Sequence, residues 1–153
     1  MNKKIISSFV IVAGFVAIFS FLLYRNITLS NQIQYVKIAG QNIKIEFAVT
    51  PEAQAKGLSG RQGLNENEGM LFIFENPGRH PFWMKDMNFA IDIIWLDEEG
   101  KIVYIQKNAT PESYPEVFGG EVPSKYVLEV ASGFSEKNNL KVGDKIQFLR
   151  SKF

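Results

Sequence analysis

Cysteine is absent from the 153-residue sequence, and histidine occurs once, at position 80. The missing thiol excludes disulfides, thiolate zinc sites, cysteine nucleophiles and a lipid anchor on cysteine, and it suits an exported chain. His80 stands between Arg79 and Pro81 in a predicted turn, so we expect a solvated loop side chain rather than a catalytic base or metal ligand. We therefore expect no metal site and no cofactor.

An excess of basic residues is also missing. The chain has 17 Lys and Arg against 16 Asp and Glu, and without Lys3, Lys4 and Arg25 the remainder has 14 basic against 16 acidic side chains. Neither this balance nor the spacing of the basic residues is typical of a nucleic-acid-binding surface. The stretch GLSGRQG is no phosphate loop, because it follows a predicted helix instead of a strand. We expect no nucleic-acid partner.

The N-terminal region contains the longest apolar run. Residues 5–24 carry no charge and, at about 1.5 Å per residue, could cross a hydrocarbon core of about 30 Å as a helix. Lys3 and Lys4 precede the run and only Arg25 follows it, so the positive-inside rule places residues 1–4 in the cytoplasm. A cleaved signal peptide is the alternative, but its usual short apolar region and small-residue cleavage site are missing here. We predict an uncleaved, single-pass signal anchor in the cell membrane.

The rest of the chain has room for one domain. Residues 25–32 are a polar linker, and residues 33–153 are predicted to form a single extracytoplasmic domain. Proline and glycine make residues 107–125 a long irregular surface segment, which is the best candidate for a lid. Alternating or continuous apolar runs predict the strands, which are 33–38, 43–49, 70–74, 82–85, 91–96, 101–106, 126–130 and 145–149.

Two segments have helical character. Thr50 followed by Pro51 is a helix start, and Gly57 or Gly60 ends that helix after about two turns. Residues 133–140 are a short helical or turn segment. The predicted fold is mainly β: a compact sandwich or barrel of seven to eight short, mostly antiparallel strands with one or two short helices.

The central stretch 69–96, GMLFIFENPGRHPFWMKDMNFAIDIIWL, combines dense apolar blocks with charge. A charge inside an apolar block is costly unless it is paired, so Lys85 and Asp92 need partners. The large side chains of these blocks are usually core, although they could line an apolar pocket. They are Phe82, Trp83, Met84 and Trp95.

A charge cluster of Arg61, Lys85, Asp86 and Asp92 is the candidate site. Alternation places Asp92 on the face of the strand at 91–96 that carries Ile94 and Leu96, and an antiparallel hairpin would set Lys85 opposite Asp92. One interpretation is a structural salt-bridge cluster. The other is a cleft in which Arg61 and Lys85 bind an anionic ligand while Asp92 orients them or acts as acid or base.

Six blocks in one order, GLSGR, GMLF, FWMK, IDIIWLD, YVLEVASG and GDKI, resemble the domain of unknown function 192 (DUF192) family, also called UPF0127. The resemblance covers about residues 36–148. It implies a compact, mainly β domain, often behind a signal or membrane segment, with no established activity. The chain departs from the family pattern at Asp86, where Asn is common, and at Ala90, where Pro is common.

Two kinds of function remain open. The first is a membrane-tethered binding or interaction module for a small ligand or an envelope protein, which fits the absence of a Ser-His-Asp set and of metal-ligand spacing. The second is a small extracytoplasmic hydrolase or lyase that uses Asp92 with Lys85 and Arg61. We favour the binding module.

Overall fold

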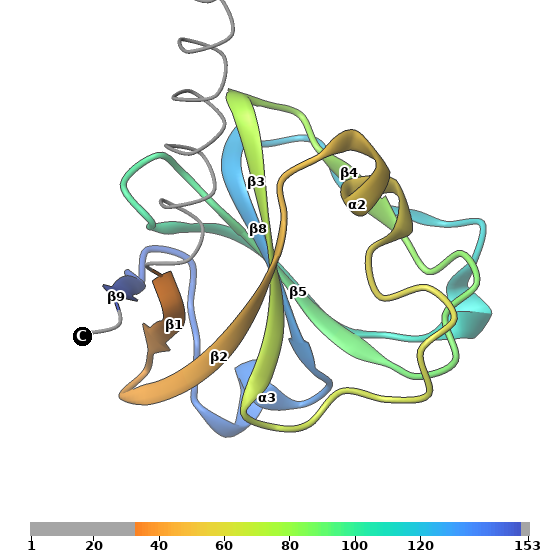
Figure 1. Ribbon diagram of the computed structural model, residues 1–153, viewed down its shortest axis with the longest axis horizontal. Coiled ribbons are helices and arrows are strands. Elements are labelled where there is room, and N and C mark those ends of the chain that lie inside the picture. Colours follow the sequence, from red (N-terminus) through yellow and green to blue (C-terminus); the bar gives the residue numbers. More distant parts are fainter. Residues whose placement is uncertain (1–32, 151–153) are drawn as a thin grey trace, which may run out of the picture. The chain divides into compact units, whose positions relative to one another are not determined.

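The computed structural model describes residues 33–150, with side chains for residues 35–149 (Figure 1). The predicted anchor at 5–24 and the linker at 25–32 lie outside the described residues. Among the described residues, no helix is both long enough and apolar enough for a membrane span. The C-terminal compact unit of the chain begins at Gln34.

A curled seven-stranded sheet, in the order β6-β5-β8-β3-β2-β1-β9, forms the body of the domain (Figure 1). β2 and β3 pair in parallel, whereas β1 with β2, β3 with β8, and β5 with both β6 and β8 pair antiparallel. The strands of this sheet are β1 (Ile33–Ile38), β2 (Gln41–Ala48), β3 (Glu68–Gly78), β5 (Ile91–Leu96), β6 (Ile102–Ala109), β8 (Ser124–Ala131) and β9 (Gln147–Arg150).

A separate two-stranded ribbon is formed by β4 (Pro81–Trp83) and β7 (Val117–Gly119), which pair antiparallel. The described helices are α2 (Pro51–Lys56), the 3-10 helix η1 (Pro111–Ser113) and α3 (Phe134–Lys137). The start of α2 is as predicted, since the Thr50 side chain accepts a hydrogen bond from Ala53 N at 3.2 Å and Pro51 takes the first helical position.

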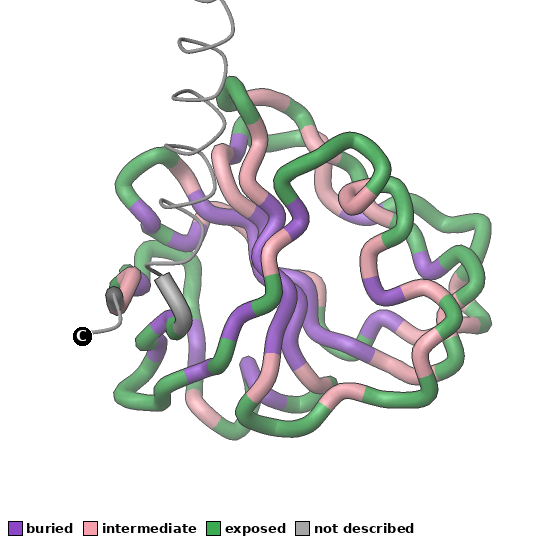
Figure 2. Tube along the Cα trace, viewed as in Figure 1, coloured by how far each residue is buried: buried purple, intermediate pink, exposed green. Residues whose placement is uncertain are grey.

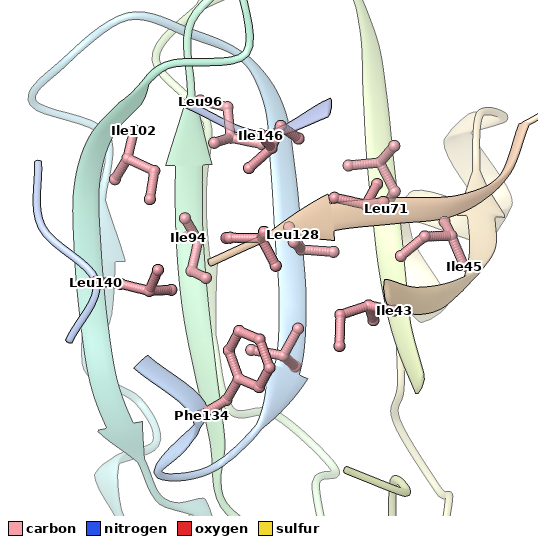
Figure 3. Packing of buried hydrophobic residues seen from close by; sticks show 13 residues of the cluster. Ile43, Ile45, Leu71, Ile94, Leu96, Ile102, Leu128, Phe134, Leu140 and Ile146 are labelled. Carbon is pink, nitrogen blue, oxygen red and sulfur yellow. The ribbon is translucent and has the colours of Figure 1, made fainter. Parts of the chain in front are cut away.

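Buried residues lie along the strands of the sheet (Figure 2). Because successive residues of a strand point to opposite sides, both faces of the sheet carry buried apolar side chains. The side that we call the α3 face carries Ile94, Leu96, Leu128 and Val130, packed with Phe134 of α3 (Figure 3). The opposite side, the ribbon face, carries Phe72, Ile93, Trp95 and Val127, packed with Met84 and Phe118. All six residues of β5 are buried, as its continuous apolar run predicted.

The mainly β prediction is confirmed, and two predicted hairpins, β1 with β2 and β5 with β6, are present. The finer architecture is a single curled sheet with a ribbon, and residues 33–150 contain nine strands rather than seven or eight.

The expected irregularity of residues 107–125 is wrong, although much of the segment is exposed as predicted, and its role as a lid stays a prediction. This segment contains the end of β6, η1, β7 and the start of β8. Phe118 is buried, and Gly119 has φ +68° and lies so close to Trp95 that a Cβ atom would be 2.4 Å from the indole Cε2. The segment is therefore packed onto the ribbon face, and only glycine fits at position 119.

Candidate functional site

A cavity of about 370 Å³ opens between α2, the turn before β4 and the ribbon face of the sheet. We call it the Glu129 pocket, because the carboxyl group of Glu129 belongs to its lining. Several segments that are far apart in the chain contribute to it, namely residues 54–59, Phe72 and Phe74 of β3, residues 80–83, Met87, and Glu129 of β8.

Aromatic rings form much of this lining. Phe72 meets Phe82 edge to face, with ring centroids 4.8 Å apart, and Phe82 meets the buried Trp95 in the same way at 5.7 Å. Phe74 stacks on His80 with a centroid distance of 3.5 Å and an interplanar angle of 7°. These contacts fix the rings against one another and present a rigid apolar wall to the cavity.

Glu129 is the buried acid of the pocket. β8 is an interior strand in which Glu129 stands opposite Met70 of β3 and Ile93 of β5, so its side chain leaves the sheet on the ribbon face. The residue is only 5% exposed, and its Oε2 has no hydrogen-bond partner within residues 35–149. Burial raises the pKa of Glu129 to about 8, against a smaller lowering by the nearby Arg61 cation. At neutral pH the carboxyl is therefore protonated.

His80 is the second polar group without a partner in this lining. Its Nε2 atom is buried and makes no hydrogen bond to the described part of the chain, and burial lowers the pKa of His80, which favours the neutral ring. The carbonyl of His80 accepts a hydrogen bond from the Trp95 indole at 2.8 Å. The expected solvated loop histidine is thus wrong: the ring is half-buried and stacked on Phe74.

The GLSGR block forms the rim of the pocket and is joined to the loop after β4. Gly57 turns the chain with φ +48°, and a Cβ there would lie 3.3 Å from Phe72 Cζ and 4.0 Å from Glu129 Oε2. Ser59 Oγ donates to the Lys85 carbonyl at 2.9 Å, and Gly60 N donates to the Asp86 carbonyl at 2.8 Å. Hydrogen bonds to backbone carbonyl groups of Lys85 and Asp86 therefore hold the rim to this loop.

The predicted charge cluster is not assembled. Arg61 Nη2 forms an ion pair with Glu46 Oε1 at 2.6 Å, and Lys85 Nζ lies over the Trp83 ring, 5.8 Å from its centroid. Asp86 is a turn residue with φ +56°, and its side chain is exposed. Among residues 35–149, no ion pair connects Asp92 with Lys85 or Arg61.

Asp92 has partners of another kind. It is fully buried, and its Oδ1 accepts from Asn108 N at 2.9 Å and Gly133 N at 3.2 Å, while Oδ2 accepts from Ser135 N at 2.7 Å. Its side chain lies on the α3 face with Ile94, as alternation predicted. Lys85 was the wrong partner because β4 pairs with β7 on the ribbon face, on the other side of the sheet.

The four apolar candidates divide into two pairs. Phe82 and Trp83 line the Glu129 pocket, and Trp83 remains 52% exposed at its edge. Met84 and Trp95 are buried core residues of the ribbon face. Glu129 was not predicted, although it is an acid inside the apolar run YVLEVA, and an acid inside an apolar run is also the signal that singles out Asp92.

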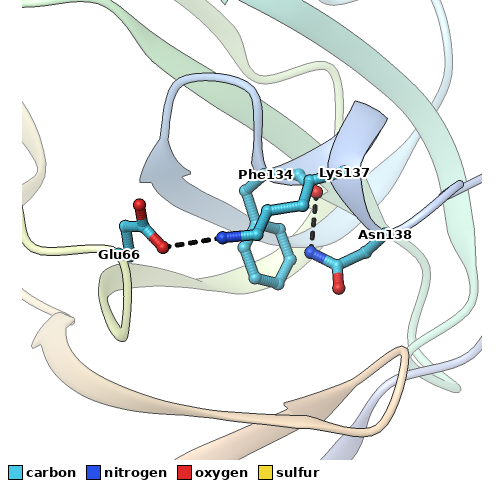
Figure 4. A network of polar contacts seen from close by, with 4 residues as sticks. All are labelled: Glu66, Phe134, Lys137 and Asn138. Atoms are coloured by element: carbon cyan, nitrogen blue, oxygen red, sulfur yellow. Dashed lines mark hydrogen bonds and ion pairs between the residues drawn. The ribbon is translucent and has the colours of Figure 1, made fainter.

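A larger cavity of about 410 Å³ lies beside α3 and is a weaker candidate. Lys137 donates to Glu66 at 2.8 Å, and Asn138 Nδ2 donates to the Phe134 carbonyl at 2.8 Å (Figure 4). The Lys137 and Glu66 side chains are 69% and 83% exposed, so this pair contributes little free energy. Within the described residues, none of the buried polar atoms that lack a partner belongs to this lining.

Fold and site together define a small, mainly β domain with a buried acid beside an aromatic pocket. The family model of domain of unknown function 192, described as "Uncharacterized ACR", matches residues 34–148. The chain belongs to this DUF192 family. No curated protein matches it.

Two solved structures are similar to the domain, both with a TM-score of 0.69. A protein of unknown function from Novosphingobium aromaticivorans is 32% identical, with 76% of this chain and 85% of that chain covered. A protein from Sinorhizobium meliloti, described as a proposed transcription regulator, is 27% identical, with 76% and 92% covered. Both support the mainly β fold.

Proposed function

We propose that this DUF192 domain is a binding module that takes a small organic ligand into the Glu129 pocket. The observation that carries the proposal is that Glu129 lines an open cavity while its buried Oε2 atom has no hydrogen-bond partner among the described residues. A buried polar atom without a hydrogen bond costs free energy. A ligand that supplies the missing partner removes that cost, so the site favours an occupied state.

Size and surface of the pocket support this proposal. Its volume of about 370 Å³ is in the range of small-molecule sites, about 300 to 1,000 Å³, which combine apolar walls with few polar groups. Here Phe72, Phe82 and Trp83 provide the wall, while Glu129 and His80 provide the polar atoms. The ligand should therefore have an apolar body and one group that forms hydrogen bonds.

The hydrolase or lyase that would use Asp92 with Lys85 and Arg61 receives no support from the geometry. Both Asp92 oxygens already accept backbone hydrogen bonds on the α3 face. Lys85 lies over Trp83 on the other side, and Arg61 is paired with Glu46. A reaction needs its groups to converge on one substrate.

We also propose that residues 5–24 anchor the chain in the cell membrane, with the domain on the outside. The support is the uncharged apolar run with Lys3 and Lys4 before it. Protease added to spheroplasts should digest the domain while the chain stays in the membrane fraction. Recovery of a soluble form that begins near Asn31 would contradict the anchor.

The binding proposal is tested with 2-phenylethanol, a neutral probe with an aromatic body and a hydroxyl group. We expect amide and indole NMR signals of Gly57, Phe74 and Trp83 to shift when the full chain, in a neutral detergent, is titrated with it. Ala55 is exposed on α2 and lines the pocket, so Ala55→Phe should block the shifts.

Glu52→Phe is the matched control, because Glu52 is exposed on the same helix and does not line the pocket. It should leave the response to 2-phenylethanol intact. Absence of any shift at the pocket in the unaltered chain, or equal responses of the two variants, would reject the proposed site.

A further inference from the structure

The Glu129 pocket combines an unpaired carboxyl group with aromatic faces. Aromatic faces attract cations through the negative charge above the ring. Trp83 already receives a cation in this way, since Lys85 Nζ lies 5.8 Å from its ring centroid. A carboxylate together with aromatic rings is a common way for proteins to hold an organic ammonium group.

We propose that the ligand of this pocket is an amine, whose ammonium group pairs with Glu129 and whose apolar body packs against Phe72, Phe82 and Trp83. This inference rests on the proposed ligand-binding function and adds the chemical class of the ligand. The ammonium N–H groups donate to Oε2 of Glu129, which has no other partner. Aliphatic and aromatic amines with one cationic end fit equally well.

Binding of such a ligand moves one proton. The empty pocket holds Glu129 protonated at neutral pH, because burial raises its pKa to about 8. An ammonium ion needs the ionised carboxylate, so the carboxyl proton leaves to solvent while the amine keeps its own proton. The ion pair then replaces a neutral acid, and no bond to carbon is made or broken.

Other charged groups near Glu129 affect this exchange. Arg61 follows α2 and lowers the pKa of Glu129, although its own charge is shared with Glu46. Lys56 lies in the lining at the end of α2, and its positive charge repels an ammonium ion. Burial lowers the pKa of His80 below its ordinary value and so favours the neutral ring.

The test compares 2-phenylethylamine with 2-phenylethanol by isothermal titration calorimetry on the full chain in a neutral detergent. Both pH 6.5 and pH 7.5 lie below the Glu129 pKa of about 8, and the ionised fraction of this carboxyl rises about eightfold between them. The amine affinity should therefore rise about eightfold while the alcohol affinity stays constant. At pH 6.5 the released proton is taken up by the buffer. The observed binding enthalpy of the amine should therefore differ between phosphate and Tris by the difference in their protonation enthalpies, for about one proton per ligand.

Glu129→Gln separates the two ideas. The amide still offers a hydrogen-bond partner, so the variant should bind the alcohol with a changed but measurable affinity, which also shows that it is folded. It should lose the pH dependence and proton release of the amine. If the unaltered chain binds the alcohol but its amine affinity does not depend on pH, the amine class is overturned and the binding function is left standing. Binding of neither probe would overturn both.

Discussion

Asp92 and Glu129 are two buried acids on neighbouring strands, and they face opposite sides of the same sheet. In the antiparallel register, Asp92 stands opposite Val130 and Ile93 opposite Glu129. Asp92 accepts three backbone hydrogen bonds, whereas one oxygen of Glu129 accepts none. Burial alone therefore does not define the role of an acid. A buried carboxyl group whose two oxygens both accept hydrogen bonds stabilises the fold, whereas one with an unpaired oxygen beside a cavity is available for a ligand.

The largest effect that sharpens this comparison is expected for Asp92→Asn. Both oxygens of Asp92 accept hydrogen bonds from backbone N–H groups. Asparagine replaces one of these oxygens by an NH2 group, which cannot accept, so one backbone N–H group loses its partner. We expect the free energy of unfolding to fall by about 3 kcal/mol, measured by denaturant unfolding of the full chain.

Asp97→Asn is the control for this change. Asp97 receives the N–H groups of Glu99 and Lys101 on the single atom Oδ1, and an asparagine Oδ1 can accept both. The loss should stay below about 1 kcal/mol. Equal losses for the two variants would mean that the hydrogen bonds to Asp92 are not what holds α3 to the sheet.

The second expected effect is a pH dependence that belongs to Glu129. Between the ordinary glutamate value of 4.5 and about 8, the folded chain binds this proton and the unfolded chain does not. The free energy of unfolding should therefore fall as pH rises through that window, by about 1.4 kcal/mol per pH unit. Denaturant unfolding at several pH values between 5.5 and 8 measures the slope.

Glu129→Gln tests the origin of that slope. The amide cannot ionise, so the stability advantage of the variant over the unaltered chain should grow steadily from pH 5.5 to pH 8. Asp92→Asn should instead be destabilising at both pH values. An unchanged slope in the Glu129→Gln variant would assign the pH dependence to other groups.

A smaller effect is expected from Arg61→Gln. This change removes the cation that lowers the pKa of Glu129, so that pKa should rise further and the unfolding slope should extend to higher pH. The lost pair with Glu46 is partly exposed and should cost at most about 1 kcal/mol. Lys137→Gln removes a cation from the exposed pair with Glu66 and should leave the slope unchanged.

The local elements of this fold could be predicted from sequence because their causes are local. Alternation and turn residues determine the hairpin of β1 and β2, and Thr50 with Pro51 determines the start of α2. The ribbon could not be predicted in this way. β7 has three residues, and its partner β4 is far away in the chain, so neither periodicity nor a turn signals their pairing.

The candidate site was predictable only in part for the same reason. Alternation correctly predicted the face of the sheet on which Asp92 lies. Its expected partner Lys85 was wrong, because Lys85 follows β4 and β4 pairs with β7 instead of β5. Phe82 and Trp83 line the pocket, which was the alternative to the core position expected for them, whereas Glu129 lies inside an apolar run and was not predicted. Its importance follows from the absence of a hydrogen-bond partner, a property that only the assembled sheet and rim determine.

The most direct test of the difference between the two acids is the pKa of Glu129 itself. A pH titration of the side-chain carboxyl carbon by 13C NMR, with the full chain labelled on glutamate and the Glu129 signal assigned by its loss in Glu129→Gln, measures this value. We expect a midpoint at about 8 and, on addition of 2-phenylethylamine, a shift of that midpoint to lower pH. A Glu129 midpoint near the ordinary value of 4.5, unchanged by the amine, would contradict the assignment of this carboxyl group as the ligand-binding acid.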